Sequence, residues 1–212
     1  MKALIKLAAR MTGLALAAVL SLSTACSTPL KQAAPKESQL TESYVWYDGS
    51  REQTVWLNPQ VVAEFNPSKL GATVAKGVDA SAMMQPMKQS QAGVRLWQIN
   101  NTAGVAVRGL TTSNPSGSYS PVLHDSPSSS GRMRALPGNI IVYLDPQWEE
   151  AKVSSWLNSH KLEIVKKLEI GPNIYVIKTD PGLAALDMAN MLYRSGEVKA
   201  AFPDWWQEVV AR

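Results

Sequence analysis

Residues 139–204 contain the same pattern twice, and this repeat constrains the fold more than any other feature of the chain. Each copy has an apolar strand, an Asp-Pro pair, an amphipathic helix and a further strand. The Asp side chains can accept the first free N–H groups of each helix, and Gly196 suits a left-handed cap at the end of the second. The order predicts an α+β fold, a ferredoxin-like βαββαβ layer of two helices on four antiparallel strands. We expect its strands at residues 140–144, 162–169, 174–177 and 198–202, a first helix ending at His160 and a second at residues 183–195.

The strands expected at residues 140–144 and 174–177 contain no charged residue and no alternation of apolar with polar side chains. A sheet covered on one side only has strands that alternate, so these two are typical of strands covered on both faces. The two helices of the layer can cover one face. The other cover would come from the N-terminal region or from another protein, and ordinary apolar exposure on a small sheet is the alternative.

Residues 1–25 have the pattern of a signal peptide. Lys2, Lys6 and Arg10 precede an uncharged apolar run that is shorter than the ~20 residues of a spanning helix. The following Leu-Ser-Thr-Ala-Cys resembles the lipobox of bacterial lipoproteins, although Ser23 stands where that family prefers Leu. The resemblance implies that Cys26, the only cysteine, is lipidated and anchors an exported protein, on the periplasmic side of the outer membrane because Ser27 follows. Ordinary signal cleavage remains the alternative.

The charge of the chain is nearly balanced once the leader is removed. Of 21 basic and 17 acidic side chains, three basic ones lie in residues 1–25, which leaves 18 basic against 17 acidic. No basic run with interleaved aromatic residues is present, so we expect no nucleic-acid partner.

The remaining chain divides by composition. Residues 26–43 are polar and predict a membrane tether, and residues 44–112 predict a small β-rich module with a hairpin at Asp48-Gly49. Residues 113–137 are rich in Ser, Pro and Gly and predict a linker that leaves two modules free to move. Residues 138–204 form the repeat layer, and residues 205–212 are a tail.

The tail begins with two adjacent tryptophans. Neighbouring side chains on a strand point to opposite faces, so Trp205 and Trp206 cannot enter one core together. We find no partner within the chain for the residues that follow. The tail is therefore predicted to add as a strand to another protein, with a frayed end or a short closing helix as the alternative.

No constellation of residues indicates an enzyme or a cofactor. The two histidines, His124 and His160, fall in the expected linker and on an apolar helix face. No Gly-x-Ser-x-Gly elbow, metal-ligand spacing or phosphate-binding loop is found in the sequence. We expect a non-enzymatic protein without a cofactor or metal.

Residues 139–204 resemble the propeptide domain of subtilisin-like serine proteases, which inhibits these enzymes and assists their folding. The resemblance rests on the opening strand, the Leu-Glu-Ile-Val-Lys-Lys-Leu stretch, the Gly-Pro-Asn turn before Ile-Tyr-Val-Ile, Ser-Gly-Glu-Val, and the closing Ala-Phe-Pro-Asp. Residues 44–65 are similar, more weakly, to the segment that opens the pro-region of some secreted subtilases. The Asp-Ser-Gly, His-Gly-Thr and Gly-Thr-Ser signatures of the protease itself are absent from this sequence.

The resemblance implies a propeptide-like chaperone and inhibitor that acts in trans on a subtilisin-like serine protease. Its free sheet face would dock on the protease, with Tyr143, Tyr175, Ile177 and Asp204 as the expected contacts. Its tail would occupy the substrate cleft; the tail residues are Trp205, Trp206, Gln207, Glu208, Val209, Val210, Ala211 and Arg212. The alternative function is an envelope lipoprotein adaptor for assembly or secretion that binds no protease.

Overall fold

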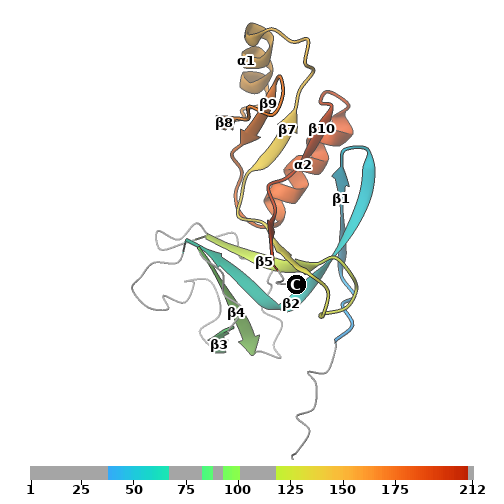
Figure 1. Cartoon of the computed structure of the whole chain (residues 1–212), viewed down its shortest axis with the longest axis vertical. Coiled ribbons are helices and arrows are strands. Elements are labelled where there is room, and N and C mark those ends of the chain that lie inside the picture. Colours follow the sequence, from blue (N-terminus) through green and yellow to red (C-terminus); the bar gives the residue numbers. More distant parts are fainter. Residues whose placement is uncertain (1–37, 67–82, 88–92, 101–117, 210–212) are drawn as a thin grey trace, which may run out of the picture. The chain divides into compact units, whose positions relative to one another are not determined.

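The computed structural model describes residues 38–66, 83–87, 93–100 and 118–209 (Figure 1). The expected signal peptide, the lipidation residue Cys26 and the tail residues Val210, Ala211 and Arg212 lie outside these ranges. Among the described residues, no helix has the length and apolarity needed to cross a membrane. The described residues form an α+β fold with two helices and two antiparallel sheets.

Among the described residues, the larger sheet has seven strands, six of them between Ser43 and Ala135 and the seventh near the end of the described chain. Its order is β11-β6-β5-β2-β4-β3, and β1 pairs with β2 outside this path. The strands are β1 (Ser43–Asp48), β2 (Arg51–Phe65), β3 (Met83–Pro86), β4 (Val94–Asn100), β5 (Ser118–His124), β6 (Met133–Ala135) and β11 (Trp206–Gln207). The β-rich character expected for residues 44–112 is thus confirmed where those residues are described.

The hairpin expected at Asp48-Gly49 joins β1 to β2. Asp48 pairs with Arg51, so the loop holds two residues, and Gly49 has a φ of 61° that suits a glycine. β2 is fifteen residues long, and the register of its pairing with β5 shifts between Asn58 and Val62. On its other edge, the two halves of β2 pair with different strands. The first half pairs with β1, and the second half pairs with β4.

Two of the expected boundaries are wrong. The linker expected at residues 113–137 contains β5 and β6 from Ser118 onward, and Tyr119 and Leu123 are buried in it. The end of the expected tether also folds: Leu40 is buried, and its N–H donates to the Pro127 carbonyl at 2.7 Å. Ser and Pro are frequent here because this part of the sheet contains an irregular pairing and tight turns.

The second sheet has four antiparallel strands in the order β10-β7-β9-β8. They are β7 (Ile140–Tyr143), β8 (Ile164–Lys167), β9 (Ile174–Ile177) and β10 (Ala200–Pro203). Helix α1 (Glu150–Ser159) connects β7 to β8, and α2 (Leu183–Ser195) connects β9 to β10. Gly196 ends α2 in the left-handed region at φ 75°, as the sequence predicts.

The expected roles of Asp145 and Asp180 as helix caps are wrong. The Asp145 carboxylate accepts the N–H of Gln147 at 2.9 Å in a turn that precedes α1, and α1 begins only at Glu150. Asp180 lies before Gly182, which occupies the N-cap position of α2 with φ 78°. Both pairs make turns that lead into the helices instead of capping them.

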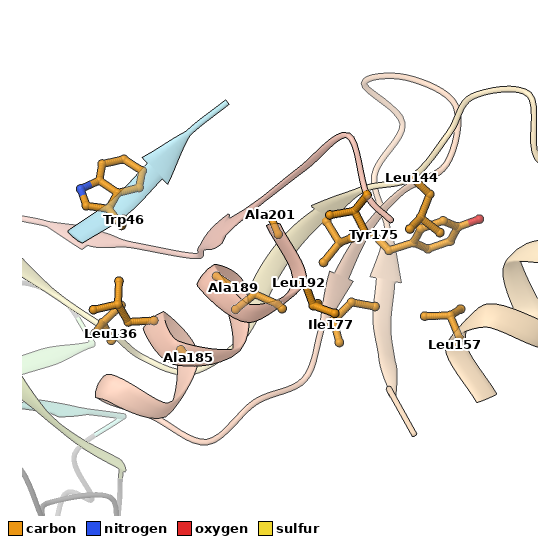
Figure 2. Packing of buried hydrophobic residues seen from close by; sticks show 14 of the residues in the cluster. Trp46, Leu136, Leu144, Leu157, Tyr175, Ile177, Ala185, Ala189, Leu192 and Ala201 are labelled. Atoms are coloured by element: carbon orange, nitrogen blue, oxygen red, sulfur yellow. The ribbon is translucent and has the colours of Figure 1, made fainter. Parts of the chain in front are cut away.

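The helices cover one face of the four-stranded sheet. Ile140 and Val142 of β7 share a core with Tyr175 and Ile177 of β9. The same core contains Leu157 of α1 and Ala185, Ala189 and Leu192 of α2 (Figure 2). The same core also contains Trp46, Val55 and Leu123 from the other sheet and Leu136, which follows β6. Asn190 of α2 also donates to the Val45 carbonyl at 2.8 Å, and Tyr193 stacks on Tyr47 with ring centroids 4.3 Å apart. The two sheets are therefore joined by a continuous core.

The junction between the sheets is a tight turn. Gly138 has a φ of 99°, and a Cβ at this position would lie 2.9 Å from the Thr179 carbonyl oxygen. Asn139 follows with a φ of 69°. Only glycine fits this conformation without moving backbone atoms, so the turn fixes the direction in which the chain enters β7.

Candidate functional site

The face of the four-stranded sheet opposite the helices is the first part of the candidate site. Its register places Ile141 of β7 between Val176 of β9 and Phe202 of β10. Tyr143 lies between Ile174 and Ala200 in the same way. Directly opposed residues share one face of an antiparallel sheet, so these six side chains form one apolar surface. We call it the open face.

No helix covers the open face within the part of the chain that the structure describes, because α1 and α2 both pack on the other side. Ile141, Tyr143 and Phe202 are only half-buried. The rings of Tyr143 and Phe202 lie 5.7 Å apart and cover part of one another. Val176 and Ile174 lie deeper between their neighbours, and Gly171 passes close to the end of the Ile174 side chain. Ala200 is buried as well, so the accessible part of the open face consists of Ile141, Tyr143 and Phe202.

Tyr143 lies on the open face as expected, but the placement of Tyr175 and Ile177 there is wrong. Ile177 is 0% exposed and pairs with Ile140, and Tyr175 pairs with Val142, so both point into the core under the helices. The Tyr175 hydroxyl bonds to the Asn173 side-chain oxygen at 3.4 Å. Ile174 and Val176, one residue earlier in each case, take the expected positions on the open face.

A groove continues the open face toward the β1–β2 hairpin. It has a volume of about 460 Å³. Its walls are Ile141 and Phe202 from the open face, Trp46, Asp48, Arg51 and Gln53 from the hairpin, Arg134 from β6, and Pro203, Asp204, Trp205 and Gln207 from the end of the chain. The groove is thus built jointly by the two sheets.

Asp204 lies in this groove at the end of β10. Its N–H donates to the Asn139 carbonyl at 3.3 Å, which fixes the backbone. The other charges of the groove are paired: Arg51 lies 3.7 Å from Asp48, and Arg134 forms an ion pair with Asp125. Over residues 38–66, 83–87, 93–100 and 118–209, the Asp204 carboxylate has no ion-pair partner, so it is the charge that a bound molecule can use.

The tail is held by its own chain up to Glu208, which corrects the expectation of a tail without an internal partner. Trp206 pairs with Ala135 and Gln207 with Arg134 of β6, and the Glu208 N–H donates to the Met133 carbonyl at 3.0 Å. Trp205 and Trp206 pack on different cores, as adjacent strand residues must. Val209 is 78% exposed. β6 is only three residues long, which is why nothing in the sequence indicated this pairing.

Two titratable groups in the described ranges have shifted pKa values, and neither of them lines the groove. Burial, together with the adjacent Glu64 carboxylate, raises the pKa of Tyr119 to about 12. The Gln147 N–H and then Lys199 lower the pKa of Asp145. Among the described residues, no group of three or more His, Cys, Asp or Glu side chains could hold a metal ion.

The two histidines have structural partners. His124 is 1% exposed, its Nδ1 lies 2.7 Å from the Gly131 carbonyl oxygen, and its Nε2 lies 3.1 Å from the Asn58 amide nitrogen. His160 follows α1, and its Nε2 lies 3.1 Å from the Glu197 carboxylate. Neither borders the groove. The open face and the groove therefore offer apolar contact, aromatic rings and one unpaired carboxylate, which is the chemistry of a protein-binding surface.

No protein-family model matches the sequence, and neither a curated protein nor a solved structure is significantly similar to it.

Proposed function

We propose that this protein acts in trans as a folding chaperone and inhibitor of a subtilisin-like serine protease. The observation that carries the proposal is the open face, an apolar surface that no helix of the described chain covers. Apolar surface of this kind, bordered by polar residues, is typical of protein–protein contact sites. A partner that binds it would be stabilised in its folded form, because binding to the native state alone shifts the folding equilibrium.

The strand order β10-β7-β9-β8, with one helix between β7 and β8 and another between β9 and β10, supports a ferredoxin-like βαββαβ layer. The sequence resemblance to subtilase propeptides runs over the same residues. In the proposed complex, Ile141, Tyr143 and Phe202 contact the protease and Asp204 provides a carboxylate at the rim of the contact. Cys26 carries the lipid anchor on the periplasmic side of the outer membrane.

A charge placed in the open face tests the proposal. Ile141→Lys should weaken inhibition roughly thirtyfold, the effect of losing about 2 kcal/mol at the centre of an interface. Met191→Lys is the matched control, since Met191 is 54% exposed on α2 and lies outside both the open face and the groove. The mature chain with Cys26→Ser would be titrated against subtilisin-like proteases with a chromogenic peptide substrate, and protease refolding yield would be measured in parallel. Equal inhibition by both variants, or none by the unmodified chain, would refute the proposal.

The adaptor function remains the second candidate, and one observation favours it. The tail is already paired within its own chain, so it does not need a protease cleft to complete it. An adaptor would bind an envelope partner through the same open face without changing protease activity or refolding yield.

A further inference from the structure

The segment Trp205–Trp206–Gln207–Glu208 is held in place by contacts with Trp46 of β1 and with the short strand β6. The Arg134 guanidinium lies 5.6 Å from the ring centroids of both Trp46 and Trp205, and these two rings meet edge to face at 5.4 Å. Trp206 packs against the core that contains Met133 and Ala135. Arg134 therefore holds the segment from outside it, through aromatic contacts and through strand pairing with Gln207.

This held state contains an unsatisfied group. The Trp205 indole Nε1 is buried, and it has no hydrogen-bond acceptor among the residues that the structure describes. A buried donor without a partner destabilises the state that contains it relative to a state in which water solvates the donor. A two-residue strand at the edge of a sheet is also a weak element, and terminal segments open more easily than core strands. The segment is thus bound closely enough to be ordered and weakly enough to leave.

We infer that this segment is a latch, which must leave β6 before the tail can act in a protease cleft. The inference rests on the proposed function and adds a regulatory step to it. A protease cleft that binds an extended peptide pairs with the backbone of the peptide and holds alternate side chains in pockets. In this structure the Trp206 side chain packs in the core that contains Met133 and Ala135, and the Gln207 backbone pairs with β6. The two states exclude one another. The free protein keeps its tail on β6, and docking of the open face precedes tail insertion.

A reversible covalent lock tests the latch. Glu208 bonds to Met133, so the neighbouring pair Gln207–Arg134 is a non-hydrogen-bonded pair, in which the side chains lie close enough for a disulfide. The double variant Arg134→Cys/Gln207→Cys would be made with Cys26→Ser, beside each single variant. The oxidised double variant should inhibit subtilisin at least tenfold less than its reduced form, yet still bind active-site-blocked subtilisin through the open face. Equal inhibition by the oxidised and reduced forms would overturn the latch.

Amide hydrogen exchange on the mature chain alone provides a second test that needs no protease. The Glu208 amide should be protected, but less than the Val142 and Ile177 amides in the central strands. Arg134→Ala should raise its exchange rate, whereas Arg51→Ala, which leaves β6 intact, should not. Exchange of Glu208 at the rate of an unstructured peptide would overturn the latch, and so would protection equal to that of the central strands. Failure of subtilisin to bind any form, with Glu208 protected as expected, would instead overturn the proposed function.

Discussion

On one face of the four-stranded sheet, Ile140 and Ile177 lie under the helices and are 0% exposed. On the other face, Ile141 and Tyr143 occupy the adjacent positions of β7 and are only half-buried. Ile140, Ile141 and Ile177 are the same residue type, and what differs is the layer that packs against them. These strands carry apolar residues on both faces, while one face has no helix over it in the described chain. Ile141 and Tyr143, half-buried on the uncovered face, therefore contribute less to folding than the buried residues and are available for binding.

The largest expected effect is a difference in stability between the two faces. Ile177→Ala should lower the free energy of unfolding by about 2–5 kcal/mol, because it leaves a cavity in a packed core. Ile141→Ala on the open face should cost less than about 1.5 kcal/mol, since solvent can fill the space. Urea denaturation of both variants measures the difference. Equal losses would mean that the open face is packed as tightly as the covered one.

Tyr119 of the larger sheet is buried, in contrast to the half-buried Tyr143 of the open face. The Tyr119 hydroxyl donates to Glu64 at 3.2 Å, and burial raises its pKa to about 12 from an ordinary value of 10. As the pH rises, the unfolded state loses the Tyr119 proton before the folded state does. The contribution of Tyr119 to stability is therefore fully present below pH 10 and is lost as the pH rises to about 12. The loss should be about 2–3 kcal/mol. Denaturation midpoints between pH 9 and about 12 should show this step, and Tyr119→Phe should remove it.

The smallest expected effect concerns the turn that leads from β7 to the covering helix. The pKa of Asp145 is lowered by the Gln147 N–H and by Lys199, which lies 3.3 Å from its carboxylate. A lowered folded-state pKa means that stability is present above the ordinary value of 3.8 and is lost as the pH falls below it. Asp145→Asn should flatten the acid limb of the stability curve slightly. An unchanged acid limb would show that this turn does not help to hold α1 over its face.

The sequence predicts the elements whose signals are local. Gly196 and Gly49 mark a helix end and a hairpin because each supplies a positive φ, and the limits of α2 and β9 follow the apolar pattern. β5 could not be predicted because Pro121 and its serines look like a loop. In the structure, Pro121 pairs with Val62 beside the register shift of β2, where a missing N–H disturbs the ladder least.

The site was predicted only in part, for two physical reasons. Strand residues 174–177 are all apolar, so no alternation with polar residues shows which side chains face the core. Pairing with β7 decides the faces on which Tyr175 and Ile177 lie. The tail pairs with β6, a short strand some seventy residues earlier in the chain. A contact between residues so far apart produces no recognisable pattern in the sequence near either of them. Trp46 and Arg134 enter the groove for the same reason, since hairpin and β6 meet it only in the folded chain.

The position of β11 has a consequence for how the molecule is made. β11 follows every other described strand in the chain, yet it completes the border of the sheet that begins at β1. During synthesis the strands up to β6 emerge first, and the edge of β6 that pairs with β11 stays unpaired until Trp206 and Gln207 have left the ribosome. An unpaired strand edge can pair with other nascent chains. Pairing of β11 with β6 therefore covers an edge of the larger sheet that could otherwise pair with another chain.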